Sequence, residues 1–567
     1  MSDKKVRVIK VGGGPYERSF KHSQQLGKDV MSGSLDYFLN FWNVKLSQMT
    51  PGLPKYLRFA LEKAIKTALV NPATKDWRLQ YRDRAILRGY CKGIKNEVPF
   101  EEMKKSFIAP DMYNYWLGWL FNRLDGKVPA VPEINGPGMG CSSMVAWGDS
   151  TVDGNMVFGR NLDFLSGDKW TDNQVLLIVE PGSGEIPFAS LCSAGIPVEG
   201  ITAMNAEGIA ISVHQNSSKA INKKGRSIIS ISNEIIARAS SVYEVIDIVS
   251  KIYPIAGWTI VVASASEKQA VIIETNAKAF DIIYPEPGRS WIRYGNSYLS
   301  PEMQEDEFSA GYTMHEHNHS RLIRMEQLLE SNAGSINPEK MAEMLGDHYD
   351  PYAKRERPFG NTISSVHNVS SAVMEPGNQR IWVALGPSPA NTSEGYVGFD
   401  IAAIRNGKDG ELGVIPGNTY YKSPGYAALR EYTLAYQAHE TLDDEKLSNH
   451  LKKAHNLDPE EPLYAFMLGI DYLKKANITL ALDALKRAEQ PCNTSYRQAA
   501  VYLWQGRCYD LLRNRATARE LYLKAYETAP KDSKIPAKAQ QGLRSPYKSS
   551  SVKGIMTELI MGDAIDV

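Results

Sequence analysis

The chain has 567 residues, enough for two or three domains, and 43% of them are hydrophobic, so a large core can form. Its 65 lysines and arginines balance its 64 aspartates and glutamates, which argues against binding nucleic acid or an anionic membrane through net charge. The first residues lack the apolar run of a signal peptide, and no stretch approaches the ~18 apolar residues of a membrane span. The cysteines form neither a disulfide framework nor a CxxC pair; they are Cys91, Cys141, Cys192, Cys492 and Cys508. We therefore expect a cytoplasmic protein.

The N-terminal region begins with a short predicted strand at Val6–Val11, followed by the glycine run Gly12–Pro15. This run lacks the GK[ST] ending and the G-x-G-x-x-G spacing of phosphate-binding loops, so we do not predict phosphate binding there. From Lys28 to about Arg123, apolar residues recur at helical spacing. We expect residues 1–140 to form a largely helical segment.

The stretch Gly138–Phe164 reads as a β-hairpin, with alternating apolar residues on two strands and a tight turn at Asp153-Gly154. The start of the first strand lies beside the end of the second in such a hairpin. Cys141, Arg160 and Asp163 are therefore expected to meet at its open end. A buried cysteine is often only a small apolar side chain, but a guanidinium beside the thiol favours the thiolate.

The residues before Cys141, Gly136–Gly140, have the composition of a deformable loop. This favours self-cleavage between Gly140 and Cys141, in which the cysteine attacks its own preceding carbonyl. The new α-amine, with a reference pKa of roughly 7.7–8.0, would then serve as the base beside the thiol.

The motif GCSSMVAWG…DGNMVFGRNLDF resembles the penicillin-type acyltransferase family (acyl-coenzyme A:6-aminopenicillanic acid acyltransferase-like) and, more distantly, the choloylglycine hydrolases and acid ceramidase. The segment GGGPYERSFKHSQQLG also resembles the N-terminal signature of this family, in which a small residue usually follows the Glu-Arg pair; Ser19 in that place is a mild departure. The resemblance spans about residues 5–415. It implies an α+β fold with a four-layer αββα sandwich, a catalytic core over 141–417, and a segment 1–140 that stays attached after cleavage.

The resemblance also implies further site residues. Asn296 follows a predicted strand, where the family places an asparagine whose amide donates to the developing oxyanion. Arg321, chosen over Arg324, corresponds to an arginine at the start of a helix that reaches the site. His214 and Asn216, at the end of another predicted strand, are expected to bind substrate, although the alternation there leaves open which of the residues 214–216 points inward.

Three alternating histidines, His315, His317 and His319, would share one face of a strand. No further carboxylate or cysteine ligand is evident nearby, so we predict no metal site. We expect instead that Ser320 and Arg321 begin a helix.

From Pro424 the composition changes, and residues 424–540 match the spacing of tetratricopeptide repeats, with two clear copies and a weaker first one. A generic helical bundle is the alternative. We expect an all-α repeat domain with a concave surface for a protein or peptide partner, and residues 541–567 to form a cap and a loose tail. Because the repeats offer no nucleophile, we expect a chain ending near Gly417 to retain self-cleavage, unless the repeats cover the site.

These patterns predict a self-processing cysteine hydrolase that cleaves a linear amide bond of a small N-acyl substrate without a cofactor. Three alternatives remain open: an acyltransferase that uses the same Cys141 thioester, a catalytically idle scaffold that binds partners through its repeats, and a conventional cysteine protease with His214 as the base. A homo-oligomer is compatible with the sequence.

Overall fold

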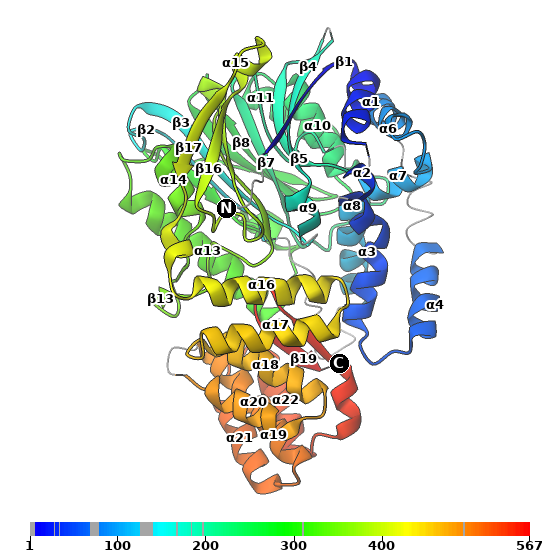
Figure 1. The fold of residues 1–567 in the computed structure, drawn as a ribbon, viewed down its shortest axis with the longest axis vertical. Helices are drawn as coiled ribbons and strands as arrows, with labels where there is room; N and C mark the ends of the chain where they lie inside the picture. Colours follow the sequence, from blue (N-terminus) through cyan, green and yellow to red (C-terminus); the bar gives the residue numbers. More distant parts are fainter. Residues whose placement is uncertain are drawn as a thin grey trace.

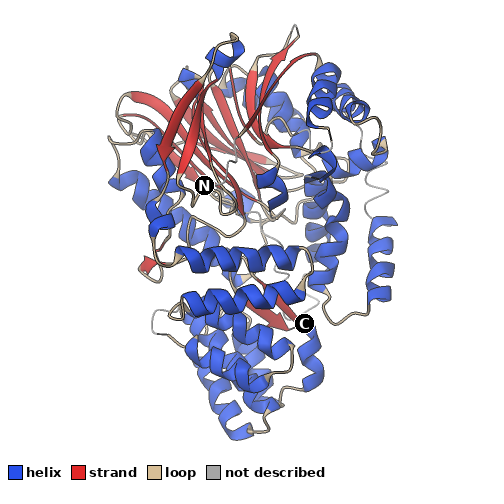
Figure 2. Ribbon diagram, viewed as in Figure 1, coloured by secondary structure: helices blue, strands red, loops and turns tan. Residues whose placement is uncertain are grey.

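The computed structural model describes residues 6–566, apart from positions 28, 33, 68–76, 78, 125–139, 166–167, 183, 196–197, 309–310 and 491–493. It has two large β-sheets with helices around them, and a helical C-terminal region below them in the view of Figure 1. Figure 2 separates the strand-rich part from the helical part. The predicted α+β class is confirmed.

The first sheet has eight strands in the order β1-β4-β5-β6-β7-β8-β9-β10. Only β1 and β4 pair in parallel; the other neighbours are antiparallel. The strands are β1 (Arg7–Gly13), β4 (Gln174–Pro181), β5 (Phe188–Ser193), β6 (Thr202–Asn205), β7 (Ile209–Gln215), β8 (Trp258–Ser264), β9 (Gln269–Thr275) and β10 (Phe280–Ile283).

The second sheet has seven strands in the order β11-β2-β3-β14-β15-β16-β17. The second and third strands in this order, β2 and β3, form the predicted hairpin, although the connection covers residues 149–153 and is longer than the predicted two-residue turn. The strands are β2 (Ser142–Gly148), β3 (Gly154–Asp163), β11 (Trp291–Tyr294), β14 (Asn368–Glu375), β15 (Arg380–Ala384), β16 (Gly395–Asp400) and β17 (Glu411–Pro416).

Strand alternation gives each sheet two apolar faces. Val145 and Phe158 of the second sheet pack with Leu176 and Ile178 of the first in one buried cluster. The neighbouring positions on β2, such as Met144, point the other way, into a cluster with α13 (Tyr312–Ser331) and α14 (Pro338–Leu345). On the first sheet, the second face packs against α10 (Ile228–Arg238) and α11 (Val242–Lys251). Because each sheet is covered on both faces, its strands must be apolar along nearly their whole length, and the sequence has such apolar runs.

The N-terminal segment is joined to the first sheet by β1 and by buried ion pairs. Arg18 binds Glu199 at 2.8 Å and Glu185 at 2.5 Å, and Arg82 binds the same two carboxylates at 2.9 Å each. Its helices are α1 (Pro15–Leu26), α2 (Asp29–Ser32), α3 (Ser34–Met49), α4 (Lys55–Ile65), α6 (Tyr81–Gly93), α7 (Phe100–Phe107) and α8 (Ala109–Leu124).

The C-terminal region consists of three antiparallel helix pairs and one final helix. The helices are α16 (Tyr426–Glu440), α17 (Asp444–Leu457), α18 (Pro462–Lys474), α19 (Ile478–Arg487), α20 (Ser495–Leu511), α21 (Arg515–Thr528) and α22 (Ile535–Arg544). The small elements elsewhere are α9 (Asp168–Asp172), α12 (Pro301–Gln304), α15 (Ile401–Arg405), β12 (Tyr349–Asp350), β13 (Arg355–Glu356), and the 3₁₀ turns η2 (Pro376–Asn378) and η3 (Thr419–Lys422).

The end of the chain is not a loose tail, contrary to our expectation. After the 3₁₀ turn η4 (Ser549–Gly554), strands β18 (Ile555–Glu558) and β19 (Asp563–Asp566) form a hairpin that returns to the first helix of each pair. Tyr432 of α16 donates to the Leu559 carbonyl at 2.8 Å, and Tyr496 of α20 donates to Asp563 at 2.8 Å. The chain's own C-terminal hairpin therefore covers part of the surface on which we expected a partner peptide.

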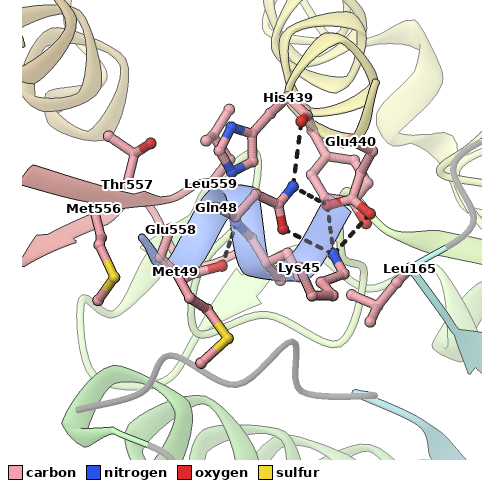
Figure 3. A pocket seen from close by; sticks show the side chains of 12 residues that line it. Lys45, Gln48, Met49, Leu165, His439, Glu440, Met556, Thr557, Glu558 and Leu559 are labelled. Atoms are coloured by element: carbon pink, nitrogen blue, oxygen red, sulfur yellow. Dashed lines mark hydrogen bonds and ion pairs between the residues drawn. The ribbon is translucent and has the colours of Figure 1, made fainter. Parts of the chain in front are cut away.

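A buried ion pair joins the N-terminal segment to the C-terminal helices (Figure 3). Lys45 of α3 donates to both carboxylate oxygens of Glu440 of α16 at 2.9 Å, and Gln48 donates to Glu440 at 3.0 Å. Residues of the C-terminal hairpin, among them Glu558, line the same small cavity. The N-terminal segment, the first C-terminal helix and the end of the chain thus meet at one place.

Two further sequence predictions need correction. The apolar spacing over Ser227–Ser250 predicts a single helix, but the structure has two, α10 and α11, because a cap at Ser241 starts a new one. The helix expected to begin at Ser320 begins at Tyr312, so all three histidines of the 315–319 run lie on it and not on a strand. None of the helices among the described residues combines the length and apolar character needed to cross a membrane.

Candidate active site

Cys141 immediately precedes β2, at the open end of the β2–β3 hairpin. The pairing of Ser143 with Arg160 brings the arginine beside it, and Arg160 Nη2 donates to Cys141 Sγ at 3.1 Å. The thiol also receives a hydrogen bond from the backbone of Asp163. Only 2% of Cys141 is exposed, so the thiol of the intact chain is closed off from solvent.

Arg160 makes hydrogen bonds to other groups besides the thiol. Its Nη2 also donates to the Val213 carbonyl at 2.6 Å, and its Nη1 lies 3.0 Å from His214 Nε2. A guanidinium can only donate, so His214 Nε2 is an acceptor here. Both side chains are almost completely buried, which fixes the arginine fork in one orientation.

A second buried guanidinium, Arg321 of α13, binds the backbone of the nucleophile. Its Nη1 donates to the Cys141 carbonyl at 2.5 Å and to Ser142 Oγ at 3.0 Å. Its Nη2 donates to Asn296 Oδ1 at 3.1 Å and to Asn318 Oδ1 at 2.7 Å. Arg321 therefore connects the start of β2 with the segment after β11.

Burial dominates the titration of this site. It raises the pKa of the Cys141 thiol, although Arg160 favours the thiolate. It also raises the pKa of Asp163 to about 7, against the opposing effects of Arg321, a hydrogen bond from Asn368 and Arg160. Burial lowers the pKa of Arg321 to about 10, which still leaves it charged at neutral pH. The intact chain thus holds a neutral thiol beside two cations and a carboxyl group that titrates near neutrality.

Asn296 lies at the site, but part of its amide is already engaged. Its Nδ2 donates to the Gln215 carbonyl at 2.9 Å while its Oδ1 accepts from Arg321. An amide nitrogen carries two hydrogens, so one donor remains for another acceptor.

His214 and Asn216 both belong to buried hydrogen-bond networks. His214 Nε2 lies 2.9 Å from Ser143 Oγ, and burial, together with Arg160 and Arg321, holds its pKa well below its usual range. Asn216 donates to the Tyr294 hydroxyl at 2.8 Å and accepts from Thr259 at 2.8 Å. Neither lines the cavity at Cys141, which Gln215 between them does.

The cavity at Cys141 is narrow and mostly apolar, with a volume of about 30 Å³. Such a volume holds only about two water molecules. The lining comes from the N-terminal helices, β3, α9, β7, α10 and β8: Ser106, Pro110, Cys141, Leu162, Phe164, Trp170, Val198, Ile201, Val213, Gln215, Ile228, Ile229, Ser232 and Trp258. A wider, more polar cleft of about 670 Å³ has Asn296 and Asn318 in its wall.

Two buried histidines that the sequence analysis did not assign to the site flank Gly140. A Cβ atom placed on Gly140 would lie 3.2 Å from His317 Nε2 and 3.2 Å from His367 Cε1. Helical periodicity could have found the first of these, because His317 and Arg321 are four residues apart and share one face of α13. No local pattern marks His367, which follows a loop before β14. Among the described residues, no group of three or more His, Cys, Asp or Glu side chains is arranged to hold a metal ion.

A protein-family model matches the middle of the chain. The model of the acyl-coenzyme A:6-aminopenicillanic acid acyl-transferase family matches residues 150–389, less than half of the 567 residues. The matched region contains Arg160, Asp163, Asn296 and Arg321, and it begins after Cys141. No curated protein matches the chain. The match supports acyl transfer or hydrolysis in general.

Proposed function

We propose, from the family match over residues 150–389 and the arrangement around Cys141, that this chain is a self-processing N-terminal nucleophile hydrolase. It cleaves a linear, non-peptide amide of an N-acyl substrate through a thioester on Cys141. The apolar clusters on both faces of both sheets support a four-layer αββα sandwich, and the three C-terminal helix pairs support tetratricopeptide-like repeats. The single observation that carries the proposal is the hydrogen bond of Arg160 to the Cys141 thiol at the open end of the β2–β3 hairpin.

In the proposed turnover, cleavage before Cys141 first frees its α-amine. The amine takes the proton of the thiol, the sulfur attacks the amide carbonyl of the substrate, and the same proton passes to the departing amine. Water, deprotonated by the α-amine, then hydrolyses the thioester and releases the acid. Asp163, whose Oδ2 has no hydrogen-bond partner among the described residues, holds the α-ammonium form.

The developing oxyanion needs donors beside the thiol. The second hydrogen of Asn296 Nδ2 is one, and Arg321 keeps the side-chain oxygen of Asn296 turned away from the reaction. A donor of this kind typically lowers the activation barrier by about 3 kcal/mol. Arg160 stabilises the thiolate as it forms.

The cavity at Cys141 supports an apolar acyl group. Its lining is mainly aliphatic and aromatic, which favours a hydrocarbon over a charged or strongly polar acyl part. In the intact chain the cavity is too small for more than a few atoms, so binding of substrate requires the chain to open at Gly140. This agrees with an inactive precursor.

An acyltransferase is the second candidate, because the same thioester can react with an amine instead of water. The idle-scaffold alternative is weakened by the intact network around Cys141 and by the C-terminal hairpin, which a peptide partner on that surface would have to displace.

The test is the intact mass of the purified protein together with hydrolysis of N-acyl amides of increasing chain length. We expect two associated fragments that separate between Gly140 and Cys141. Cys141→Ala should give one uncut chain of 63.1 kDa without activity, whereas Cys91→Ala, in a buried position on α6, should be cut normally. A wild-type protein that stays uncut and still hydrolyses amides would overturn the mechanism.

A further inference from the structure

The self-cleavage proposed above lacks a base in its first round. Before cleavage, the α-nitrogen of Cys141 belongs to a peptide bond and cannot accept a proton. Burial raises the pKa of the thiol, so spontaneous ionisation is also disfavoured. Another group must take the proton from Cys141.

His214 is not suited to this task. Its Nε2 already accepts from Arg160 and contacts Ser143 Oγ, and its ring also hydrogen-bonds to the backbone of Cys141 and Gly295. Both ring nitrogens are therefore engaged.

His317 has the required free lone pair. Its Nδ1 lies 2.6 Å from the Gly360 carbonyl oxygen, which can only accept, so Nδ1 carries the hydrogen and Nε2 is an acceptor. Nε2 is buried and has no hydrogen-bond partner among the described residues. It faces Gly140, the residue whose carbonyl is attacked.

The environment of His317 also favours passing a proton on. Burial, Arg321 and His367 all lower its pKa well below its usual range, so the ring is neutral at rest and its Nε2 lone pair is available. The same low pKa makes uptake of the thiol proton unfavourable by itself, so the ring holds the proton only while the sulfur bonds to carbon, and it then readily gives the proton up. The charged or titratable groups around it are Arg321 on its own helix, His367 before β14 and Arg497 on α20.

We propose that His317 is the base for the first self-cleavage and is dispensable for later turnover. Its Nε2 accepts the Sγ proton as the sulfur bonds to the Gly140 carbonyl carbon. The bond from that carbon to the Cys141 nitrogen then breaks, and His317 returns the proton to this nitrogen. Water hydrolyses the Gly140 thioester to a carboxylate and a free thiol, with the new α-amine as base. This inference rests on the proposed function.

The two rings also leave little room for a side chain at residue 140. A Cβ atom there would lie 3.2 Å from His317 Nε2 and 3.3 Å from His367 Nε2, tighter than most such contacts, so the rings would have to shift. We therefore expect Gly140→Ala to slow self-cleavage as well.

The test uses the full chain with His317→Asn, whose amide can still donate to the Gly360 carbonyl but cannot act as the base. We expect self-cleavage, followed by intact mass, to slow about 100-fold, as for loss of a general base. Turnover per cleaved molecule, counted from the fraction of cut chain in the intact-mass spectrum, should change less than about threefold, because a general base contributes only to the step it serves. His450→Asn, in the C-terminal helices and paired with Glu431, is the control and should be cut normally.

A second variant separates chemistry from structure. His317→Gly leaves space for free imidazole, which should restore cleavage in proportion to its concentration. A folded His317→Gly chain that stays uncut and does not respond to imidazole would show a structural role only and would overturn the inference. Normal cleavage of His317→Asn would also overturn it, and the proposed function would stand. An uncut wild-type chain would remove the proposed function itself.

Discussion

The most informative single change is Asp163→Asn in an uncleavable Cys141→Ala chain. Asp163 is completely buried, and its pKa rises from the usual 3.8 to about 7, mainly through burial. Its Oδ1 accepts from Asn368 at 2.6 Å, and it makes no ion pair within 4.0 Å among the described residues. The folded intact chain should therefore hold this carboxyl protonated at mildly acidic pH.

The sign of the pH effect follows from proton uptake. The folded chain keeps the Asp163 proton up to pH of about 7, whereas the unfolded chain loses it near 3.8. The stability that this proton contributes is complete below pH 3.8 and is lost as pH rises toward 7. The loss is about 1.4 kcal/mol for each pH unit, on the order of 4 kcal/mol in total. Asparagine does not titrate, so the free energy of unfolding of the asparagine variant should rise relative to its parent between pH 4 and 7 and then level off.

Urea unfolding of the two chains at pH 5, 6, 7 and 8 measures this difference. We expect the gap in free energy of unfolding to widen by about 3 kcal/mol from pH 5 to 7 and to stay constant above pH 7. A constant gap over the whole range would mean that Asp163 is already ionised at pH 5. In that case the two arginines, and not burial, would govern its charge, and our account of the site's electrostatics would be wrong.

Three other changes test separate parts of the structure. Arg160→Lys keeps the charge but cannot bind the thiol and the Val213 carbonyl with one planar group. We expect kcat per cleaved molecule to fall about 30-fold, a rise of about 2 kcal/mol in the activation free energy, with little change in the free energy of unfolding. Lys45→Met leaves Glu440 buried without its cation and should lower the free energy of unfolding by about 3–5 kcal/mol in urea titrations, whereas adding Glu440→Met should restore most of it. A stop after Arg544 removes the C-terminal hairpin and should increase binding of an apolar dye, and a synthetic 549–567 peptide should reverse this.

Most strands could be predicted because their apolar runs are short and bounded by turn residues. The apolar runs predict strands over 174–179, 188–193, 259–263 and 270–274. β5 has the predicted bounds, and β4, β8 and β9 are one or two residues longer at an end. Helix boundaries were harder where a helix is polar. The N-terminal half of α13 carries histidines and asparagine in place of an apolar stripe, because this half faces the buried polar site and not only the core.

The site residues that lie close together in the sequence could be predicted, because the pairing of the two hairpin strands is enough to bring Arg160 beside Cys141. The orientation of residues 214–216 could not, because a shift of one residue reverses which side chains face the cavity. Val213 and Gln215 of β7 line it, so the intervening His214 points to the other face of the strand. His367 reaches Gly140 from a part of the chain more than two hundred residues away, and only the three-dimensional structure shows this contact.

The packing between the C-terminal helices and the site changes one expectation. We expected a chain ending near Gly417 to cleave itself, yet Phe359 stacks on Tyr432 of α16 with ring centroids 4.1 Å apart. The next residue, Gly360, supplies the carbonyl that fixes the tautomer of His317.

Removing the helices would take away the aromatic ring that holds this segment and would expose the fully buried Phe359 to water. We now expect the shortened chain to stay uncut even where it folds, because the free nitrogen of His317 would no longer be aimed at Gly140. Intact mass of the chain ending at Gly417 tests this, with Tyr432→Ala in the full chain as the milder change. If the shortened chain cleaves itself at the wild-type rate, the helices do not support the site, and they form an independent module as the sequence first indicated.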